Sequence, residues 1–587
     1  MGAIIKNMKV TQDPITVFEL LTKYQKLNVP RYQREYSWDN EQFSDMFNDI
    51  AEADEDLGHF FGSLLLYCED DNKKPAEIID GQQRITTFFL LLNAVKNHLI
   101  EYGEKKKADK KTQSIIEKSI EKINTCIYAV SKKLKDTHQN QTPRLETGKR
   151  DNKLFSELIK GRDHKNVIDK SINSHKLILK ASQSYFSKNL KELETANGID
   201  AIIDFLDKLF ASKFIVMTAE KNTDKVLLFK TLNARGLELA QSDLIKNEIC
   251  KAVDEADIEN AIDTWDEIKS IIEKANGNIE TFLFHYLNSN NETKKLRTLL
   301  EEKRGGKSKI QYAPIVPEKY VFEIFELLLK KSEDIFELLN EIKNQSEVYV
   351  EFLIPNKKDK AYNNLVGLKA LNISKCYPLL LGGKVLLNDK DFVKLVNAVE
   401  VISFRHSILR EDPKELEKLY YKVLTSINLN KDVNKGLEII NSHPTNKRLT
   451  EFNEYFVKSS PKSITSKYIL YRITRHHQEA IEWGAKDIHL EHVMPQKPSG
   501  QWLKLKNLNE DQYEEYLNRI GNLTLLNDKL NIGASNKDFK TKKIEYYTKS
   551  RLFVTKEYFK NFQTWDFQKI EQRQKEILNI ANKIWKI

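Results

Sequence analysis

A polar turn between two apolar runs most constrains the fold, and it lies in the stretch EIIDGQQRITTFFLLL at residues 77–92. The first run ends in two isoleucines and is typical of a short strand. In the second run, apolar residues recur from Ile85 to Val95 with helical spacing. The chain therefore passes from strand to helix through a turn that carries a carboxylate, two amides and a guanidinium.

Length sets the number of domains. The chain has 587 residues, more than the roughly 250–300 residues that one hydrophobic core supports, so several domains are expected. Its composition, 40% hydrophobic and 30% charged, is ordinary for a soluble, helix-rich protein. The net charge of +9 is compatible with nucleic-acid binding without requiring it, because surface lysines also serve solubility.

Cysteines and apolar segments argue against several classes of protein. The four cysteines are far apart and form no CxxC pair, so neither a zinc knuckle nor a disulfide framework is expected. No apolar stretch reaches the ~18 residues of a membrane span. The first residues, MGAIIKNMKV, lack the apolar region of a signal peptide, and we expect a cytoplasmic protein.

The pattern predicts a multidomain α+β chain that is mostly helical. Residues 1–250 mix helix and strand signals: DPITVFELLTKY is typical of a helix with Pro14 in its first turn, and HFFGSLLLY and AEIID are typical of strands. Residues 251–460 are nearly all helical in pattern and predict a connector or scaffold. Residues 461–587 are rich in His, Asn and Tyr and end in a helix, FQKIEQRQKEILNIANKIW.

Three segments of the first part share an unusual mixture of aromatic, amide and charged residues. Besides the turn at 77–92, VPRYQREYSWDNEQF (29–43) places arginines and a glutamine among aromatic rings. LFKTLNARGLELAQSDLIKNEI (228–249) has a helix break at NARG (233–236), with Ser242-Asp243 as a plausible new N-cap. Caps, turn residues and stacked arginines would explain each segment alone, whereas the three together favour a function.

A helix that begins at Gln82 would direct its free N–H groups and the positive end of its dipole over the polar turn, which suits a phosphate. Arg84 could add a two-pronged contact to phosphate oxygens. Asp80 would repel a phosphate, so it would instead hold Mg²⁺ or orient Arg84. Arg31 and Arg34 could close the other side, and the nearby aromatic rings offer stacking faces for a base.

Four motifs in order, VPRYQREYSW, FFGSLLL, IIDGQQRITT and FKTLNARGLELAQSDLIKN, resemble the N-terminal domain of GmrSD-type restriction proteins. The resemblance implies a ParB/sulfiredoxin-like fold that binds and hydrolyses nucleoside triphosphates. It implies nucleotide-binding roles for Asp80, Gln82, Gln83, Arg84 and Thr86, and more loosely for Arg31, Gln33 and Arg34. On this interpretation the polar turn is a site for nucleotide phosphates.

A second constellation of polar residues lies near the end of the chain, in DIHLEHVMPQ (487–496) and RIGNLTLLNDKLNIGASNKDFKTKK (519–543). Two histidines and a glutamate fall within four residues of a short strand-like pattern, and two asparagines follow beyond a loop. Core histidines and turn asparagines would be the ordinary explanation. The combination also suits a one-metal nuclease, which needs an unprotonated imidazole to activate water and oxygen ligands for Mg²⁺ or Mn²⁺.

This pattern resembles the ββα-metal (HNH) nuclease domain that closes GmrSD-type proteins, with matches at EH, P, GNL and the second asparagine. The resemblance implies that His492 is the general base and that Glu491 and Asn531 are metal ligands, with His489 as an alternative ligand. It places Asn522 in the catalytic set as the residue that steadies the loop carrying His492. Lys542 and Lys543 could hold a DNA backbone phosphate.

The resemblance implies a modification-dependent endonuclease for phage defence that acts on double-stranded DNA. Glucosylated hydroxymethylcytosine is the modification usually associated with such proteins, and phosphorothioate sensing with nicking is an alternative. A nucleotide-gated DNA-binding module without cleavage, and a nuclease acting on RNA or unmodified host DNA, are further alternatives. One HNH site cuts one strand, so a double-strand break would need two visits or two protomers, as in a homodimer.

Overall fold

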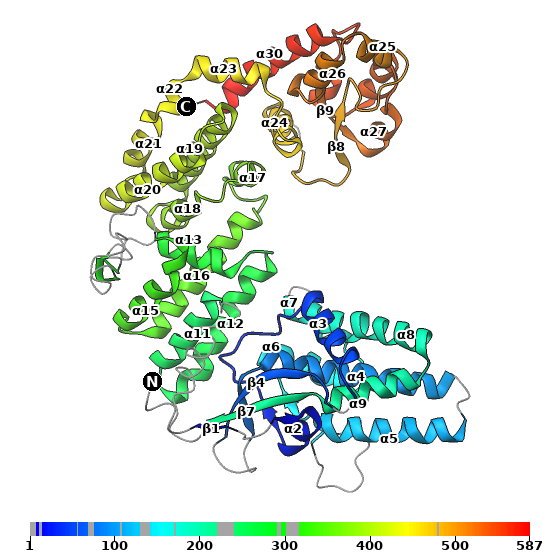
Figure 1. Cartoon of the computed structure of the whole chain (residues 1–587). Helices are drawn as coiled ribbons and strands as arrows, with labels where there is room; N and C mark the ends of the chain where they lie inside the picture. The colour runs from blue at the N-terminus through cyan, green and yellow to red at the C-terminus, as the bar shows by residue number, and fades with distance from the viewer. Residues whose placement is uncertain are drawn as a thin grey trace. The chain divides into compact units, whose positions relative to one another are not determined.

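A computed structural model describes residues 8–10, 14–55, 57–68, 75–105, 109–129, 141–169, 172–219, 240–289, 295–296, 298–300, 316–477 and 481–586. The chain is mostly helical, with one mixed sheet in its first part and a small hairpin near its end (Figure 1). It divides into two compact units, residues 1–276 with 332–339 and residues 277–331 with 340–587. The finer division at residues 250 and 460 stays a prediction.

The sheet of the first unit brings the polar segments to one edge. Its strands are β1 (Met8–Val10), β2 (Ile15–Thr16), β3 (Leu27–Asn28), β4 (Phe60–Tyr67), β5 (Ala76–Asp80), β6 (Leu145–Glu146) and β7 (Lys213–Ala219). The order is β1-β7-β4-β5-β3-β6, and β2 also pairs with β7. Because β5, β3 and β6 are parallel neighbours, the chain leaves all three at the same edge, where ligands commonly bind in sheets of this kind.

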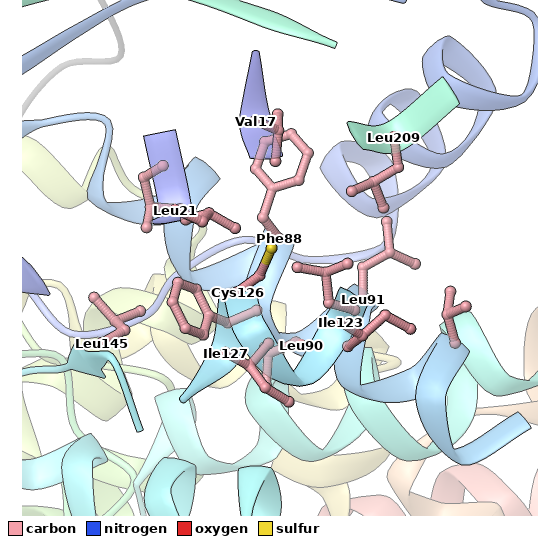
Figure 2. Packing of buried hydrophobic residues seen from close by; sticks show 14 of the residues in the cluster. Val17, Leu21, Phe88, Leu90, Leu91, Ile123, Cys126, Ile127, Leu145 and Leu209 are labelled. Atoms are coloured by element: carbon pink, nitrogen blue, oxygen red, sulfur yellow. The ribbon is translucent and has the colours of Figure 1, made fainter. Parts of the chain in front are cut away.

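Helices cover this sheet, and α4 (Gln82–Lys105) supplies much of the core. Around it are α2 (Val17–Lys23), α3 (Asn40–Ala51), α5 (Lys110–Ile127), α6 (Lys149–Ile159), α7 (Asn173–Leu179), α8 (Phe186–Asn197) and α9 (Asp200–Ala211). Figure 2 shows Phe88, Leu90 and Leu91 of α4 packed among side chains of α2, α5 and α9. Burying each such side chain stabilises the fold by about 1.5–3 kcal/mol, so the helix after the polar turn is firmly held.

The predicted strands HFFGSLLLY and AEIID are confirmed as β4 and β5, and a helix does begin at Gln82. The predicted helix near Pro14 starts later than expected, at Val17. Residues 15–16 pair with β7 instead. Thr16 caps the helix, because its Oγ1 accepts from Glu19 N at 3.1 Å while its own N–H donates to the Glu19 carboxylate at 2.8 Å.

The middle of the chain contains helices and no strand in its described part, as the sequence predicted. After α11 (Gln241–Ala252), which ends the first part, the α-helices of the middle are α12 (Ile258–Lys274), α13 (Ile279–Ser289), α15 (Val321–Lys331), α16 (Ile335–Leu353), α17 (Tyr362–Ala370), α18 (Tyr377–Leu386), α19 (Asp389–Leu409), α20 (Pro413–Asn430), α21 (Val433–Ser442), α22 (Pro444–Lys447) and α23 (Leu449–Lys458). Across the described residues, no helix combines the length and apolar character needed to cross a membrane.

The last part of the chain is built around an antiparallel hairpin of β8 (Ile488–His492) and β9 (Leu523–Asn527). Helix α27 (Asp528–Ala534) follows β9 directly and packs against both strands. Helix α24 (Ser463–His476) lies against β9, and α30 (Phe567–Ile584) packs on the short helix η7 (Ile520–Asn522). Gly521 permits this contact, since a Cβ there would lie 2.2 Å from the carbonyl oxygen of Ile570.

Candidate functional sites

The two glutamines of the polar turn fasten the 29–38 loop to the sheet edge. Gln82 Nε2 donates to the carbonyl of Arg34 at 2.7 Å. Gln83 Nε2 donates to the carbonyl of Glu35 at 3.2 Å, and its Oε1 accepts from Ser37 N at 2.8 Å. Both glutamines are buried, so in this structure their amides bind protein groups and thereby fix the shape of the loop.

Arg84 is also held within the fold. Its Nη1 donates to the carbonyl of Phe61 at 2.6 Å, and its Nη2 lies 3.2 Å from Asp80 Oδ2. Burial lowers the pKa of the Arg84 guanidinium, and the neighbouring Asp80 partly opposes that effect. Of the two roles expected for Asp80, this geometry matches the orientation of Arg84. Gly81 makes the tight turn possible, with φ of +94° and Leu64 where a Cβ would be.

The other residues predicted to bind a nucleotide differ in whether their side chains already have partners within the protein. Gln33 is buried and donates to the carbonyls of Ile78 and Ile79 at 2.5 and 2.9 Å. Thr86 is buried in α4, and Arg31 forms an exposed ion pair with Glu259. Arg34 is half-buried, and its guanidinium has no hydrogen bond or ion pair with another described residue. It is therefore the cation in this group that is most available to a ligand.

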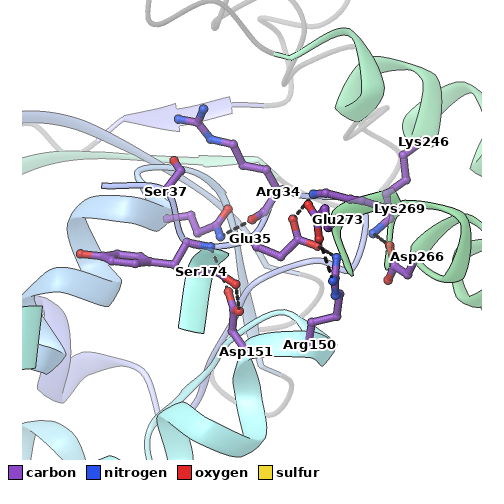
Figure 3. Close-up of polar contacts among 12 residues, drawn as sticks. Arg34, Glu35, Ser37, Arg150, Asp151, Ser174, Lys246, Asp266, Lys269 and Glu273 are labelled. Carbon is purple, nitrogen blue, oxygen red and sulfur yellow. Dashed lines mark hydrogen bonds and ion pairs between the residues drawn. The ribbon is translucent and has the colours of Figure 1, made fainter. Parts of the chain in front are cut away.

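Charged side chains next to the 29–38 loop form a network of ion pairs (Figure 3). Glu35 pairs with Arg150 at 3.0 Å and with Lys269, and Arg150 also pairs with Glu273 at 3.0 Å. Burial alone would raise the pKa of Glu35, but Lys269 and Arg150 outweigh it and lower the pKa to about 2. Glu35 thus stays ionised and joins the loop to α6 and α12. The sequence offered no signal for this network, because its members are distant in the chain.

The third polar segment contributes Asp243 and Lys246 from α11. Its break at 233–236 lies outside the described residues. The predicted N-cap at Ser242-Asp243 is wrong, because α11 begins at Gln241 after Ala240. Asp243 instead lies in the first turn, where burial raises its pKa to about 6 against the opposing attraction of Lys269. Lys246 pairs with Asp266 at 2.8 Å.

In the C-terminal part, Glu491 of β8 forms a buried ion pair. Lys542, on the π-helical turn η8 (Lys542–Tyr546), places its Nζ 2.7 Å from Glu491 Oε1. Tyr547 donates to the same oxygen at 3.2 Å, so Oε2 receives neither bond. Burial raises the pKa of Glu491, and Lys542 opposes that rise.

The expected role of the two lysines in binding DNA needs revision. Lys542 is fully buried and also donates to the carbonyl of His492 at 2.8 Å. Lys543 donates to the carbonyls of Lys560 and Phe562 at 2.8 and 2.7 Å. A DNA phosphate cannot reach Lys542 in this fold, and Lys543 is already bonded within the protein. Lys542 serves instead to position the end of β8.

His492 ends β8 beside Asn518, a residue that the sequence did not single out. His492 Nε2 lies 3.1 Å from Asn518 Oδ1. With that oxygen as acceptor, Nε2 carries the proton and Nδ1 is left with a lone pair. Burial lowers the pKa of His492, while the hydrogen bond that its ring donates to Asn518 partly raises it. The imidazole is therefore held in one orientation and favoured in its neutral form.

Asn522 is fully buried and uses all of its hydrogen-bonding capacity. Its Oδ1 accepts from Met494 N at 2.8 Å and from Trp565 Nε1 at 3.2 Å. Its Nδ2 donates to the carbonyls of Met494 and Leu517 at 3.0 and 2.9 Å. The two bonds to Met494 hold the segment just after His492, and the other two join it to Trp565 and Leu517. The expected role of Asn522 in steadying the loop that carries His492 stays a prediction.

Asn531 on α27 differs from Asn522, because its buried Oδ1 has no hydrogen-bond partner among the described residues. A buried, unpaired amide oxygen fits a ligand for a hard cation such as Mg²⁺ or Mn²⁺. His489, the alternative ligand, is half-buried, and its Nε2 lies 3.2 Å from Asp528 Oδ1. No group of three or more His, Cys, Asp or Glu residues suited to a metal occurs in the described ranges.

Two family models match the chain. The GmrSD restriction endonuclease N-terminal domain matches residues 17–250, and the GmrSD restriction endonuclease C-terminal domain matches residues 443–580. The first match contains the three polar segments and the sheet edge, and the second contains the β8–β9 hairpin and α27. A comparison with curated proteins finds no match.

Proposed function

The chain belongs to the GmrSD restriction endonuclease family, and from this premise we propose that it is a metal-dependent HNH-type nuclease that cuts modified phage DNA. The observation that carries this proposal is the arrangement of strand, strand and helix that presents His492. A hairpin followed by a helix is the order that a ββα-metal nuclease requires, and His492 lies at the end of its first strand.

In the proposed reaction, His492 takes a proton from the attacking water through Nδ1, while Asn518 holds the ring by its other nitrogen. Asn522 keeps the segment after His492 in place through its bonds to Met494. A bound Mg²⁺ or Mn²⁺ would supply charge stabilisation at the phosphate. Glu491 and Asn531 would hold this ion, with His489 as the alternative ligand.

Measuring both the nicking rate and the DNA affinity of a single variant tests this assignment. His492→Ala should lower the nicking rate by ~10²–10⁴ because it removes a general base, while DNA affinity should persist because cationic contacts to phosphates dominate it. His476→Ala, at the exposed end of α24, is the matched control and should cut normally. Full activity of His492→Ala with Mg²⁺ or Mn²⁺, or activity that survives chelation, would contradict the proposal.

We propose further that the first unit binds a nucleoside triphosphate over the polar turn and regulates cutting. Support comes from the start of α4 at Gln82 and from Arg34, whose carbonyl Gln82 binds and whose guanidinium forms no hydrogen bond or ion pair with a described residue. Arg34→Ala should weaken the binding of labelled nucleotide by about tenfold or more, the effect of one lost charge-assisted contact. Lys118→Ala, at an exposed position of α5, is the comparison and should bind nucleotide normally. Equal affinities in wild type and Arg34→Ala would exclude this placement.

The substrate modification is tested directly on DNA. Purified protein should nick DNA containing glucosylated hydroxymethylcytosine, with nucleotide altering the rate, and should leave unmodified DNA intact. Preferential nicking of phosphorothioate DNA would replace the proposed modification with that alternative. Binding without nicking on any of these DNAs would instead identify a binding module, and equal cutting of RNA or unmodified DNA would identify a general nuclease.

A further inference from the structure

Ile532 on α27 is an exposed apolar side chain next to a proposed metal ligand. It keeps 70% of its surface accessible, and it directly follows Asn531, whose buried Oδ1 has no partner among the described residues. A single exposed isoleucine is ordinary on a protein surface. This one differs in its place, because DNA that approaches the proposed ligand also meets the next side chain of the same helix.

The packing of α27 fixes the direction in which Ile532 points. Ala534 is buried and Leu530 is partly buried in the aromatic core beneath the helix. Gly533 lies against the ring of Tyr546, since a Cβ there would be 2.3 Å from a ring carbon. These contacts prevent the helix from rotating about its axis, and isoleucine, which is branched at Cβ, has few rotamers. Ile532 is therefore a stiff apolar projection on a fixed helix.

The charged side chains near Ile532 leave this surface basic. Lys529, one turn earlier on α27, and Lys540, just beyond the loop that follows α27, are both exposed, and neither forms a hydrogen bond or ion pair with a described residue. Asp528 is also exposed, but it pairs with His489. Free cations complement the phosphates of DNA, so the charge around Ile532 suits DNA as the partner of this face.

The way in which α27 is held favours the minor groove. The major groove admits a whole helix, but α27 packs against both strands of the hairpin and against η8, so it presents only one exposed strip. The minor groove is too narrow for a helix, yet proteins that bind there insert single apolar side chains between base pairs and read base edges with asparagine. Ile532, followed by the exposed Asn536, matches this second mode.

We propose that Ile532 inserts into the minor groove of DNA beside the nick and separates two stacked base pairs. Such unstacking bends the duplex, and the bend presents the phosphate at that step to His492. Steps that unstack easily, such as TA, should therefore be cut first. The inference rests on the proposed nuclease activity on DNA and adds to it a residue that shapes the substrate.

Nicking rates on DNA containing glucosylated hydroxymethylcytosine test this role. Ile532→Ala should nick about tenfold more slowly and lose the preference for TA steps, because the inserted side chain is gone. Ile532→Leu keeps an apolar side chain of similar size and should keep most of the rate. Ile464→Ala, at an isoleucine of α24 that is 53% exposed, is the matched control and should nick normally. Because both isoleucines are exposed, all three variants should unfold at the temperature of wild type.

Two further measurements distinguish an effect on DNA shape from a general defect. A mismatched base pair at the nicked step is already easier to unstack, so it should restore the rate of Ile532→Ala to within about threefold of wild type. A fluorescent adenine analogue at that step emits more light when it is unstacked. Its emission should rise when wild type binds the duplex without metal, and it should not rise with Ile532→Ala.

The outcomes separate this inference from the nuclease assignment. Normal nicking of fully paired DNA by Ile532→Ala, or a defect that the mismatch does not relieve, would overturn the inference and leave the nuclease in place. A rise in emission that needs Ile532, in a wild type that nicks no DNA, would support the inference and remove the nuclease. Absence of both binding and nicking would overturn both. A lower sedimentation coefficient of Ile532→Ala without DNA would assign this face to contacts between copies of the chain, and it too would overturn the inference.

Discussion

Lys542 Nζ lies 2.7 Å from Glu491 Oε1, and the lysine side chain is entirely shielded from solvent. Burial lowers the pKa of Lys542, and Glu491 opposes that change. Two charges removed from water are tolerated only when each finds partners, and here Tyr547 and the carbonyl of His492 complete the set. The pair therefore ties η8 to the end of β8, next to the proposed general base.

Removing one member of this pair should be costly. Lys542→Met should lower the free energy of unfolding by about 3–5 kcal/mol, because it leaves a buried carboxyl group without its counter-charge. The double variant Glu491→Gln with Lys542→Met removes both charges and should lose much less. Urea unfolding followed by tryptophan fluorescence measures both. A single variant as stable as wild type would show that the ion pair does not hold this region.

The fall of the nicking rate at low pH should report the protonation of His492. Burial lowers its pKa below the ordinary value of 6.5, so the neutral base should persist at pH values where an exposed histidine is protonated. The nicking rate should therefore fall with a midpoint below pH 6.5. Asn518→Leu removes the bond that raises this pKa, so its midpoint should move lower still, together with a slower rate. A midpoint above 6.5, or one that Asn518→Leu leaves unchanged, would argue against this assignment.

Asp243 should make the first unit less stable as pH rises. Its folded pKa of about 6 exceeds its ordinary value of 3.8, so the folded state binds the proton more tightly and stability declines between those two pH values. Asp243→Asn should raise the free energy of unfolding at pH 7 by up to about 2–3 kcal/mol, and this gain should vanish below pH 3.8. Urea titrations across this pH range, with the exposed Asp254→Asn as control, measure the effect. The same pH dependence of the free energy of unfolding in both variants would contradict this role of Asp243.

Sequence patterns succeeded where residues act within their own element. The apolar spacing after Ile85 predicted α4, and the isoleucines before Asp80 predicted β5. The start of α2 was missed because a capping box at Thr16 and pairing with β7 outweighed the preference of Pro14 for a first helical turn. Local propensity therefore identified the elements better than it identified their ends.

Side-chain roles were harder to predict, because they depend on partners distant in the chain. Lys542 was expected to face DNA, yet Glu491, which precedes it by 51 residues, holds it in the interior. Asn518 and the partners of Glu35 gave no local signal for the same reason. By contrast, the bonds of Asn522 to the segment after His492 could be anticipated, since its loop and the one after His492 belong to the same hairpin.

The two asparagines of the C-terminal site should respond in opposite ways to substitution. Asn522→Ala takes the partner from three buried groups of Met494 and Trp565 and from the part-buried carbonyl of Leu517, so it should lower the free energy of unfolding by more than about 2 kcal/mol. Asn531→Ala removes an oxygen that has no described partner, so stability should be unchanged or slightly higher. Thermal unfolding distinguishes the two variants.

The dependence of nicking on Mn²⁺ should then distinguish a structural role from a role as metal ligand. If Asn531 holds the ion, Asn531→Ala should nick poorly at low Mn²⁺ and recover partly as Mn²⁺ is raised, with the half-maximal concentration shifted at least about tenfold. Asn522→Ala should show no such recovery, because its defect lies in the position of the segment after His492. Normal nicking by Asn531→Ala at limiting Mn²⁺ would leave His489 as the candidate ligand, which the same titration of His489→Ala would examine.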